Sequence, residues 1–316
     1  MKNLLITRPL PATVIEAAND TFEVTVRNVN DPLTKAEMTG ALMSYDAVLP
    51  TLGDVFSADV FPATPRCEIL ANFGVGFNHI DAVAARAAGI EVTNTPGAVT
   101  DATADIAMTL MLMTCRRAGE GERMVRAGSW PGWNPTQLLG MHVSGKTIGI
   151  IGMGRIGKAI AKRAAAGFGM KVVFYNRSAV TGLPFEATQF DTLQQVMAAA
   201  DVVVLAVPAT PQTRHLINAD ALLAMTPDSY LINIARGDIV EEAALIDALQ
   251  NDRIAGAGLD VYEFEPKVPE ALIALENVTL LPHLGTSAQE VRVQMGMMAV
   301  ANLKSFFNGE LVPNPV

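Results

Sequence analysis

The sequence predicts an α/β protein with two domains, each built on a doubly wound parallel sheet. Short apolar strand patterns alternate with helical patterns along nearly the whole chain, as expected of parallel sheets. A glycine-rich turn within residues 146–161 joins an apolar strand to a helix near the middle of the chain. The length of 316 residues, half of them hydrophobic, is enough for two well-packed domains.

Residues 2–95 predict the smaller domain. Strand and helix patterns alternate there in the order NLLIT, Ala12–Ala18, FEVTV, Lys35–Met43, DAVLP, CEILAN and EVTN. Directly after CEILAN, Gly74 and Gly76 can expose consecutive backbone N–H groups at the carboxyl end of the sheet, where such folds bind ligands. A simple glycine turn is the alternative interpretation. We expect the nearby His79 to be a structural hydrogen-bonding residue rather than a catalyst.

A long helix is predicted from residue 101, with Thr100 or Asp101 as its cap and Asp105 in its first turn. Its methionines are expected in a core or a subunit interface. After four arginines, residues 128–140 predict an irregular arm that carries the only tryptophans of the chain, Trp130 and Trp133. Tryptophans on such an arm commonly anchor it to another surface, here a candidate second subunit.

The glycine-rich turn has the spacing of a dinucleotide-binding motif. Thr147–Ile151 predicts a strand and Lys158–Phe168 a helix, with Gly152, Gly154 and Gly157 in G-x-G-x-x-G order between them and at the helix start. The first glycine would allow the turn, the second would let the backbone approach a pyrophosphate, and the third would let helix and strand pack closely. The pyrophosphate would bind to free N–H groups at the helix start.

The next strand pattern, KVVFY, indicates which dinucleotide binds. Nineteen residues after Gly157, where an NAD-binding unit would place an acid for the ribose 2′-hydroxyl, the chain has Asn176, followed by Arg177 and Ser178. These residues offer an amide, a cation and a hydroxyl to a 2′-phosphate. We therefore expect NADP(H) to be preferred, with NAD(H) possible. The alternative is that Arg177 is a solvated turn residue and NAD binds without its usual acid.

Further strands are predicted at ATQF, DVVVLAVP, SYLINIA, AGAGLDV and VTLLPH, and a polar helix at Ser287–Phe307. Near-continuous runs of Val, Ile and Leu indicate strands buried on both faces of a sheet.

Three polar residues follow successive strands of this sheet and are candidates for catalysis. Arg236 could bind a carboxylate with a bidentate fork and polarise an adjacent carbonyl. Glu265 follows AGAGLDV, and His283 ends VTLLPH. A carboxylate beside a histidine stabilises its protonated form, which could give a proton to an oxygen as hydride reaches the neighbouring carbon.

Each of these residues also has a structural interpretation. Arg236 could form a turn ion pair with Asp238, Glu265 could be a capping or surface acid like its neighbour Glu263, and His283 could lie in a core. Their joint placement at the ends of successive strands favours the catalytic interpretation.

Composition excludes several function classes. The net charge of −9 and the absence of a basic stripe argue against nucleic-acid binding, so an anionic substrate would need local arginines. The apolar stretch Ile106–Cys115 is too short to span a membrane, and the first residues lack a signal-peptide pattern, so we expect a cytoplasmic protein. Cys67 and Cys115 have no metal or redox spacing; we expect them to be buried and predict no metal site.

The motifs GIIGMGRIG, NIARGDIV, AGLDVYEFEP and LLPHLGTSA together resemble the D-isomer-specific 2-hydroxyacid dehydrogenases over almost the whole chain. The resemblance implies two flavodoxin- or Rossmann-like domains around a cleft. Residues 1–96 with 284–316 would form the substrate-binding domain, and residues 97–283 the dinucleotide-binding domain. NFGVGFNHID, the tryptophan arm and the NRS turn are most similar to glyoxylate and hydroxypyruvate reductases, which implies NADPH-dependent reduction of these small 2-ketoacids to glycolate and D-glycerate.

The resemblance also implies roles for individual residues. The catalytic residues would be Arg236, Glu265 and His283. The substrate carboxylate would bind to Arg236 and to the N–H groups of Val75 and Gly76, with Leu52 nearby. In a homodimer, one of the two tryptophans of the arm, Trp133 rather than Trp130 by our expectation, would reach the partner's active site. Asp260 would hold the nicotinamide carboxamide and Thr103 would lie near it, while the remaining cofactor contacts would come from Arg155, Ile156 and Pro208.

Two other functions stay open on the sequence alone. Another D-2-hydroxyacid dehydrogenase could act on a bulkier ketoacid or on phosphoglycerate, although the N-terminal loops show no added basic cluster for a phosphate. A non-catalytic dinucleotide sensor would need only the glycine-rich turn, so the presence of all three catalytic candidates argues against it.

Overall fold

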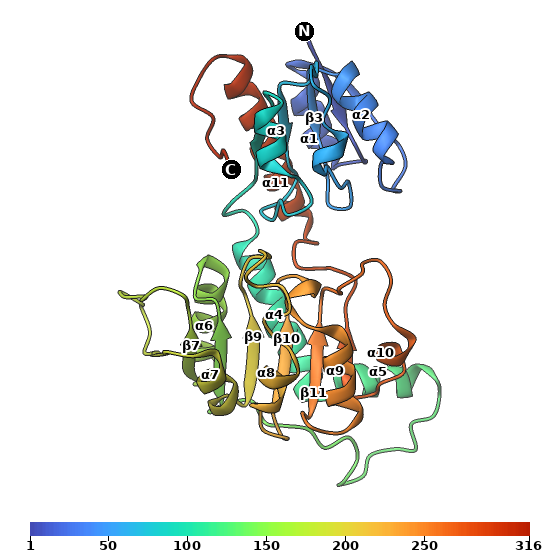
Figure 1. Cartoon of the computed structure of the whole chain (residues 1–316). Helices are drawn as coiled ribbons and strands as arrows, with labels where there is room; N and C mark the ends of the chain where they lie inside the picture. The colour runs from blue at the N-terminus through green and yellow to red at the C-terminus, as the bar shows by residue number, and fades with distance from the viewer. The chain divides into compact units, whose positions relative to one another are not determined.

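The computed structural model describes residues 1–316. The chain divides into two compact units, Met1–Val99 with Thr286–Val316, and Thr100–Gly285 (Figure 1). The boundaries between the units thus lie at 99/100 and 285/286, whereas the sequence analysis expected them at 96/97 and 283/284. Each unit has its own parallel sheet and is described by itself.

The first unit contains a five-stranded sheet in the order β2-β1-β3-β4-β5, with every pair parallel. This is the flavodoxin-like strand order. The strands are β1 (Lys2–Ile6), β2 (Phe22–Val26), β3 (Ala47–Leu49), β4 (Ile69–Ala71) and β5 (Glu91–Thr93).

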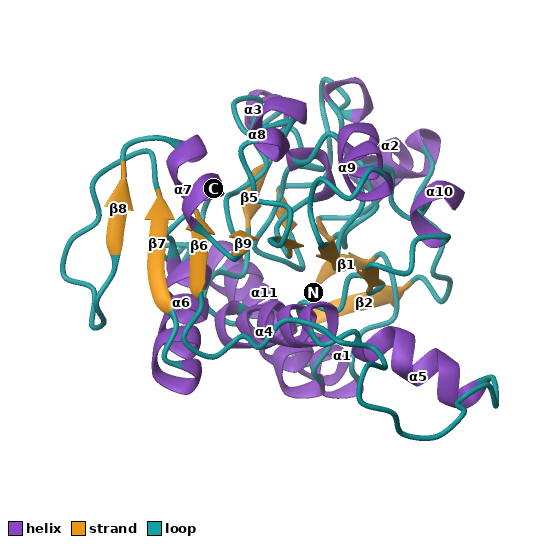
Figure 2. Cartoon of the chain, turned by 90° about the horizontal axis from the view of Figure 1, so that it is seen from below, coloured by secondary structure: helices purple, strands orange, loops and turns teal.

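Helices α1 (Ala12–Asn19), α2 (Lys35–Ser44), α3 (Ala82–Ala87) and α11 (Gln289–Phe307), with the 3-10 helix η1 (Ala58–Val60), complete this unit. Helix α11 comes from the end of the chain yet packs against β4 and α1. Figure 2 labels the two helices α1 and α11. A Cβ atom at Gly296 would lie 2.5 Å from the side chain of Val14, so only glycine allows α1 and α11 to approach this closely.

The second unit contains a seven-stranded parallel sheet in the order β12-β11-β10-β9-β6-β7-β8. From β6, the strands β7 and β8 extend the sheet on one side and β9 to β12 extend it on the other, which creates between β6 and β9 the switch point where Rossmann-type sheets bind ligands. The strands are β6 (Thr147–Ile151), β7 (Lys171–Tyr175), β8 (Thr188–Phe190), β9 (Val202–Leu205), β10 (Tyr230–Asn233), β11 (Gly256–Leu259) and β12 (Val278–Leu280).

Two apolar cores cover the two faces of this sheet. Val203 and Leu205 pack with α7 (Leu193–Ala199), α8 (Ala219–Leu223) and α9 (Glu242–Gln250). The alternating residues Val202 and Val204 pack with α4 (Thr100–Cys115) and α6 (Arg155–Phe168). Burial on both faces explains the continuous apolar runs in the sequence. The remaining helices are α5 (Ala118–Arg126), α10 (Glu270–Ile273) and the 3-10 helix η2 (Gly237–Ile239).

Every strand pattern named in the sequence analysis forms a strand, but several helical details differ. The C-terminal helix α11 begins at Gln289 rather than at Ser287. Helix α6 begins at Arg155 rather than at residue 158. Asp105 lies beyond the first turn of α4, where it forms an ion pair with Arg163 of α6. The arginine-rich stretch after α4 forms helix α5, which buries no residue and is supported by Arg117–Glu120 and Arg126–Glu122 pairs within and just before the helix.

No helix of the chain combines the length and the apolar character that a membrane span requires.

Burial of the two cysteines generates a prediction about their reactivity. Cys67 and Cys115 lie in the cores, and burial raises the pKa of each thiol to about 12. Because the thiolate is the reactive form, we expect no reaction of the native protein with Ellman's reagent at pH 8 and reaction of both thiols after denaturation. Rapid labelling of either cysteine without denaturant would contradict the buried placement.

Candidate active site

The glycine-rich turn connects β6 to α6. Gly152 has a φ of +99°, and a Cβ atom there would lie 2.8 Å from the carbonyl oxygen of Ala206. A Cβ atom at Gly157 would lie 2.1 Å from the Gly152 carbonyl oxygen, so helix and strand pack closely, as the spacing predicted. Gly154, in contrast, has no protein atom within 4 Å of its Cβ position and caps α6 without a side-chain hydrogen bond. The N–H groups at the start of α6 therefore fit a pyrophosphate.

The tip of β7 lies against this turn. The side-chain oxygen of Asn176 accepts a hydrogen bond from the backbone N–H of Met153 at 3.2 Å, and its amide nitrogen donates to the Ser178 carbonyl at 3.0 Å. Arg177 and Ser178 are exposed. Donors and a cation, with no carboxylate in this turn, suit a ribose 2′-phosphate better than a 2′-hydroxyl.

Glu265 and His283 are in direct contact. The Oε2 atom of Glu265 lies 2.9 Å from Nδ1 of His283, and its Oε1 atom accepts from the Tyr262 N–H at 3.0 Å. Burial opposes ionisation of Glu265, but the His283 contact, the Tyr262 N–H and the charge of Arg236 outweigh it and lower the pKa of this carboxyl. Glu265 is thus a carboxylate near neutral pH. Because it binds Nδ1, the other ring nitrogen of His283, Nε2, is the one that can serve a substrate.

Arg236 follows β10 and lies in the same corner of the unit. A Cβ atom at the next residue, Gly237, would lie 1.8 Å from the backbone carbon of Tyr262, so the turn after β10 touches the turn that carries Glu265. Burial lowers the pKa of Arg236, and the charges of Glu265 and Asp238 oppose that effect. The guanidinium stays a cation at neutral pH, since an arginine does not deprotonate in proteins.

Asp260 and Thr103 hold the turn that follows His283. The carboxylate oxygens of Asp260, a residue that is 1% exposed, accept from the N–H groups of Leu284 at 2.6 Å and Gly285 at 2.8 Å. The Thr103 hydroxyl donates to the Gly285 carbonyl at 3.1 Å. Burial raises the pKa of Asp260, and the two N–H groups counter it. The sequence analysis gave these residues only cofactor contacts and missed this structural role.

Glu263 is not a surface acid, contrary to the expectation from the sequence. Its side chain is 8% exposed, and its Oε1 atom lies 2.7 Å from Nε2 of His215. Its other oxygen accepts from the Glu242 N–H at 3.3 Å, which ties the Glu265 loop to the start of α9. Pro208 lies in the loop that leads to His215, and its carbonyl accepts from the Thr213 hydroxyl at 2.7 Å. No sequence motif marked His215 or Glu263.

In the first unit, the loop after β4 presents two unused N–H groups. Asn72 donates to the carbonyls of Gly74 at 3.0 Å and Gly76 at 3.1 Å, and Asn94 donates to the Val75 carbonyl at 2.9 Å. The N–H groups of Val75 and Gly76 have no acceptor in the protein. His79 contacts the Asn72 side chain at 3.0 Å and is buried, so it is a structural residue, as expected. This loop fits a carboxylate.

The comparisons with known proteins agree with this geometry. Residues 108–285 match the family model described as D-isomer specific 2-hydroxyacid dehydrogenase, NAD binding domain. The chain belongs to this family. It is 42% identical to a glyoxylate reductase of Thermococcus kodakarensis, over 99% of this chain and 95% of that protein. It is 37% identical to a glycerate dehydrogenase of Hyphomicrobium methylovorum, over 98% of this chain and 97% of that protein.

A solved structure supports the same assignment. The NADPH-dependent glyoxylate/hydroxypyruvate reductase of Sinorhizobium meliloti, in complex with NADP and malonate, superimposes with a TM-score of 0.87 at 38% identity, covering 100% of this chain and 96% of that one. The resemblance and the fold class predicted from the sequence are therefore confirmed, and this member of the 2-hydroxyacid dehydrogenase family is an oxidoreductase with an NAD-binding domain. The roles of its individual site residues stay predictions.

The Glu265–His283 contact generates a prediction for this dehydrogenase. In Glu265→Gln the ring of His283 loses the carboxylate that orients it, so reduction should slow by about 10- to 100-fold. The measurement is kcat for 2-ketoacid reduction. Glu276→Gln, which changes an exposed acid paired with Arg123, is the control. An unchanged kcat for Glu265→Gln would rule out this role.

Proposed function

We propose that this dehydrogenase reduces glyoxylate and hydroxypyruvate to glycolate and D-glycerate with NADPH. The observation that carries the proposal is the Glu265–His283 contact beside the Arg236 cation. The names of similar proteins, glyoxylate reductase, glycerate dehydrogenase and glyoxylate/hydroxypyruvate reductase, support these substrates. The product acid keeps the carboxylate of the ketoacid, and its carbonyl becomes a hydroxyl.

When bound, the nicotinamide would supply the hydride for the carbonyl carbon. In the proposed reaction His283 donates the proton from Nε2 to the carbonyl oxygen, so that one hydride and one proton convert the carbonyl to a hydroxyl. We expect Arg236 of the second unit to bind a carboxylate and polarise the adjacent carbonyl, and the N–H groups of Val75 and Gly76 of the first unit to bind a carboxylate. Leu52 provides an apolar contact. Glu265 orients the ring of His283 through Nδ1.

We propose NADP(H) as the preferred cofactor. Arg177 and Ser178 would bind the 2′-phosphate, with Asn176 ordering their turn, and Gly152, Gly154, Arg155, Ile156 and Gly157 would surround the pyrophosphate. Thr103, Pro208 and Asp260 would lie along the rest of the dinucleotide. Asp260 already holds the turn after His283, so a carboxamide contact would use its remaining lone pairs. The relative from Sinorhizobium meliloti is described as NADPH-dependent.

We further propose that the enzyme is a homodimer. Trp133 is 82% exposed, and Trp130, Val125 and Leu139 on the same arm and its preceding helix are also exposed. Large apolar side chains that gather on one segment are typical of a covered surface. Trp133 would contact the substrate site of the partner subunit. The cytoplasmic location expected from the sequence stays a prediction.

The first test of this function is NADPH oxidation at 340 nm. We expect oxidation to depend on added glyoxylate or hydroxypyruvate and to fall by about 10²- to 10⁴-fold in His283→Ala, because the proton donor is lost. His142→Ala, which changes a histidine of the segment after the arm, is the control. NADPH binding without turnover of any small ketoacid would instead support a non-catalytic sensor.

The second test concerns the cofactor. Arg177→Ala should raise the KM for NADPH by roughly 10-fold and leave the KM for NADH nearly unchanged, because a charge-assisted hydrogen bond to the 2′-phosphate is lost. Lys171→Ala, an exposed cation at the opposite end of β7, is the matched control. An equal effect of Arg177→Ala on both cofactors would remove this residue from the assignment.

A further inference from the structure

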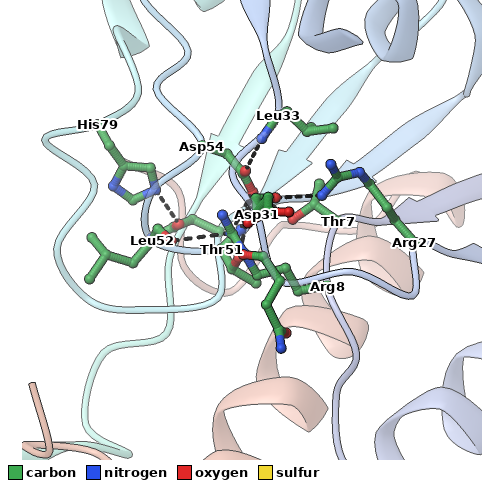
Figure 3. A network of polar contacts seen from close by, with 11 residues as sticks. Thr7, Arg8, Arg27, Asp31, Leu33, Thr51, Leu52, Asp54 and His79 are labelled. Atoms are coloured by element: carbon green, nitrogen blue, oxygen red, sulfur yellow. Dashed lines mark hydrogen bonds and ion pairs between the residues drawn. The ribbon is translucent and has the colours of Figure 1, made fainter. Parts of the chain in front are cut away.

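A buried ion pair lies at the carboxyl ends of β1 and β3 in the first unit (Figure 3). Asp54 is 0% exposed, and its Oδ2 atom accepts from the Thr7 hydroxyl at 2.6 Å and from Nη1 of Arg8 at 3.0 Å. Backbone N–H groups also donate to this carboxylate, from Leu33 at 3.0 Å and from Thr51 at 3.2 Å. The buried charge is therefore fully paired and hydrogen-bonded, as a buried carboxylate requires.

The same guanidinium binds the backbone of the turn that Asp54 ends. Nη1 of Arg8 donates to the Leu52 carbonyl at 3.1 Å and contacts the Thr51 hydroxyl, while Nε donates to the Asn30 carbonyl at 2.8 Å. Residues 51–54 are thus held by the Arg8 guanidinium and by the carboxylate of Asp54, which is itself part of the turn. Such a turn has little freedom to move.

The turn presents one large side chain. Leu52 is 41% exposed, and in Figure 3 its side chain projects away from the ion pair. Gly53 has a φ of +103°, and a Cβ atom there would lie 3.2 Å from Nη2 of Arg8. Both the backbone conformation and the guanidinium therefore disfavour any residue other than glycine at this position. At the base of the turn, the Pro50 carbonyl accepts from the Phe73 N–H at 3.0 Å. This bond connects the turn to the loop with the unused N–H groups of residues 75 and 76.

We propose that Arg8 and Asp54 are positioning residues that hold Leu52 in place. The fixed Leu52 side chain then limits the size of the 2-ketoacid that can bind. The inference rests on the proposed function, because it needs a ketoacid at the loop of residues 75 and 76. Neither residue touches the substrate; each acts through the backbone of the turn. A fixed Leu52 admits the short side chains of glyoxylate and hydroxypyruvate and disfavours bulky ones. When the turn loosens, small substrates lose a contact and large ones gain room.

The experiment compares Arg8→Gln, Arg8→Lys and Leu52→Ala in the full-length enzyme. We expect Arg8→Gln to raise the KM for glyoxylate by about 10-fold with kcat nearly unchanged, and to lower the preference for glyoxylate over phenylpyruvate by about 10-fold. Arg8→Lys keeps the charge beside Asp54 but cannot reach all the acceptors at once, so it should restore part of the preference. The Kd for NADPH should stay the same in each variant.

The matched control is the Arg66–Asp46 pair, which joins an arginine to the aspartate at the opposite end of β3 at 3.0 Å. Arg66→Gln should change neither KM nor selectivity. The double variant Arg8→Gln/Leu52→Ala should be no less selective than Leu52→Ala alone, because both changes act through one side chain. Thermal melts show whether Arg8→Gln is merely unstable. If it is, Arg8→Lys, which keeps a cation beside Asp54, provides the same test in a folded protein.

Two outcomes separate failure of this inference from failure of the proposed function. If the wild-type enzyme reduces glyoxylate but Arg8→Gln keeps its KM and selectivity, or if the two changes add in the double variant, the positioning role is refuted and the proposed function stands. If the wild type reduces no small 2-ketoacid, the proposed function fails and this inference falls with it.

Discussion

The candidate chemistry of the second unit depends on one hydrogen bond, between the Glu265 carboxylate and Nδ1 of His283. It joins the turn after β11 to the turn after β12, and it leaves Nε2 for a substrate. The bond persists because the carboxyl is ionised: its histidine partner, the Tyr262 N–H and the nearby arginine together outweigh the cost of burial. A neutral carboxyl would lack the negative charge that pairs with the histidine ring.

That hydrogen bond requires a backbone that no strand or helix supplies. His283 has a φ of +55°, a left-handed conformation that costs a non-glycine residue about 1 kcal/mol. Asp260 offsets this cost by binding the next two N–H groups, and Thr103 binds the carbonyl of Gly285. The buried Asp260 therefore has a structural reason to be an acid, whatever contact it makes with a cofactor. Its raised pKa reflects the cost of placing that charge in the interior.

The sequence predicts the strands and the glycine-rich turn well because their signals are local. Runs such as DVVVLAVP need no partner to be recognised, and the three glycines of the turn form a motif that can be read within one short stretch of sequence. The polar anchors could not be predicted in the same way. Thr7 and Asp54 are 47 positions apart, and His215 and Glu263 are 48 apart, so only the folded sheet brings them together. Helix α5 was missed because it buries no residue, and its sequence AGEGERMVR has few apolar side chains and two glycines, which disfavour a helix.

Three buried polar side chains, Asp54, Asn72 and Asp260, hold loops in the same way. Their arrangement suggests how the substrate preference of such a fold can change while the fold is kept. Asp54 holds the turn of Leu52, Asn72 holds the loop of Val75 and Gly76, and Asp260 holds the turn that follows His283. In each case a buried polar side chain at the carboxyl end of a strand binds the backbone of the loop, so the side chain that the loop presents is free to differ. Replacing an anchor leaves buried N–H groups or a buried charge without a partner, which is costly, whereas replacing a presented side chain such as Leu52 removes only an exposed contact. Substrate preference can therefore vary at the loop tips while the anchors keep the loops in place.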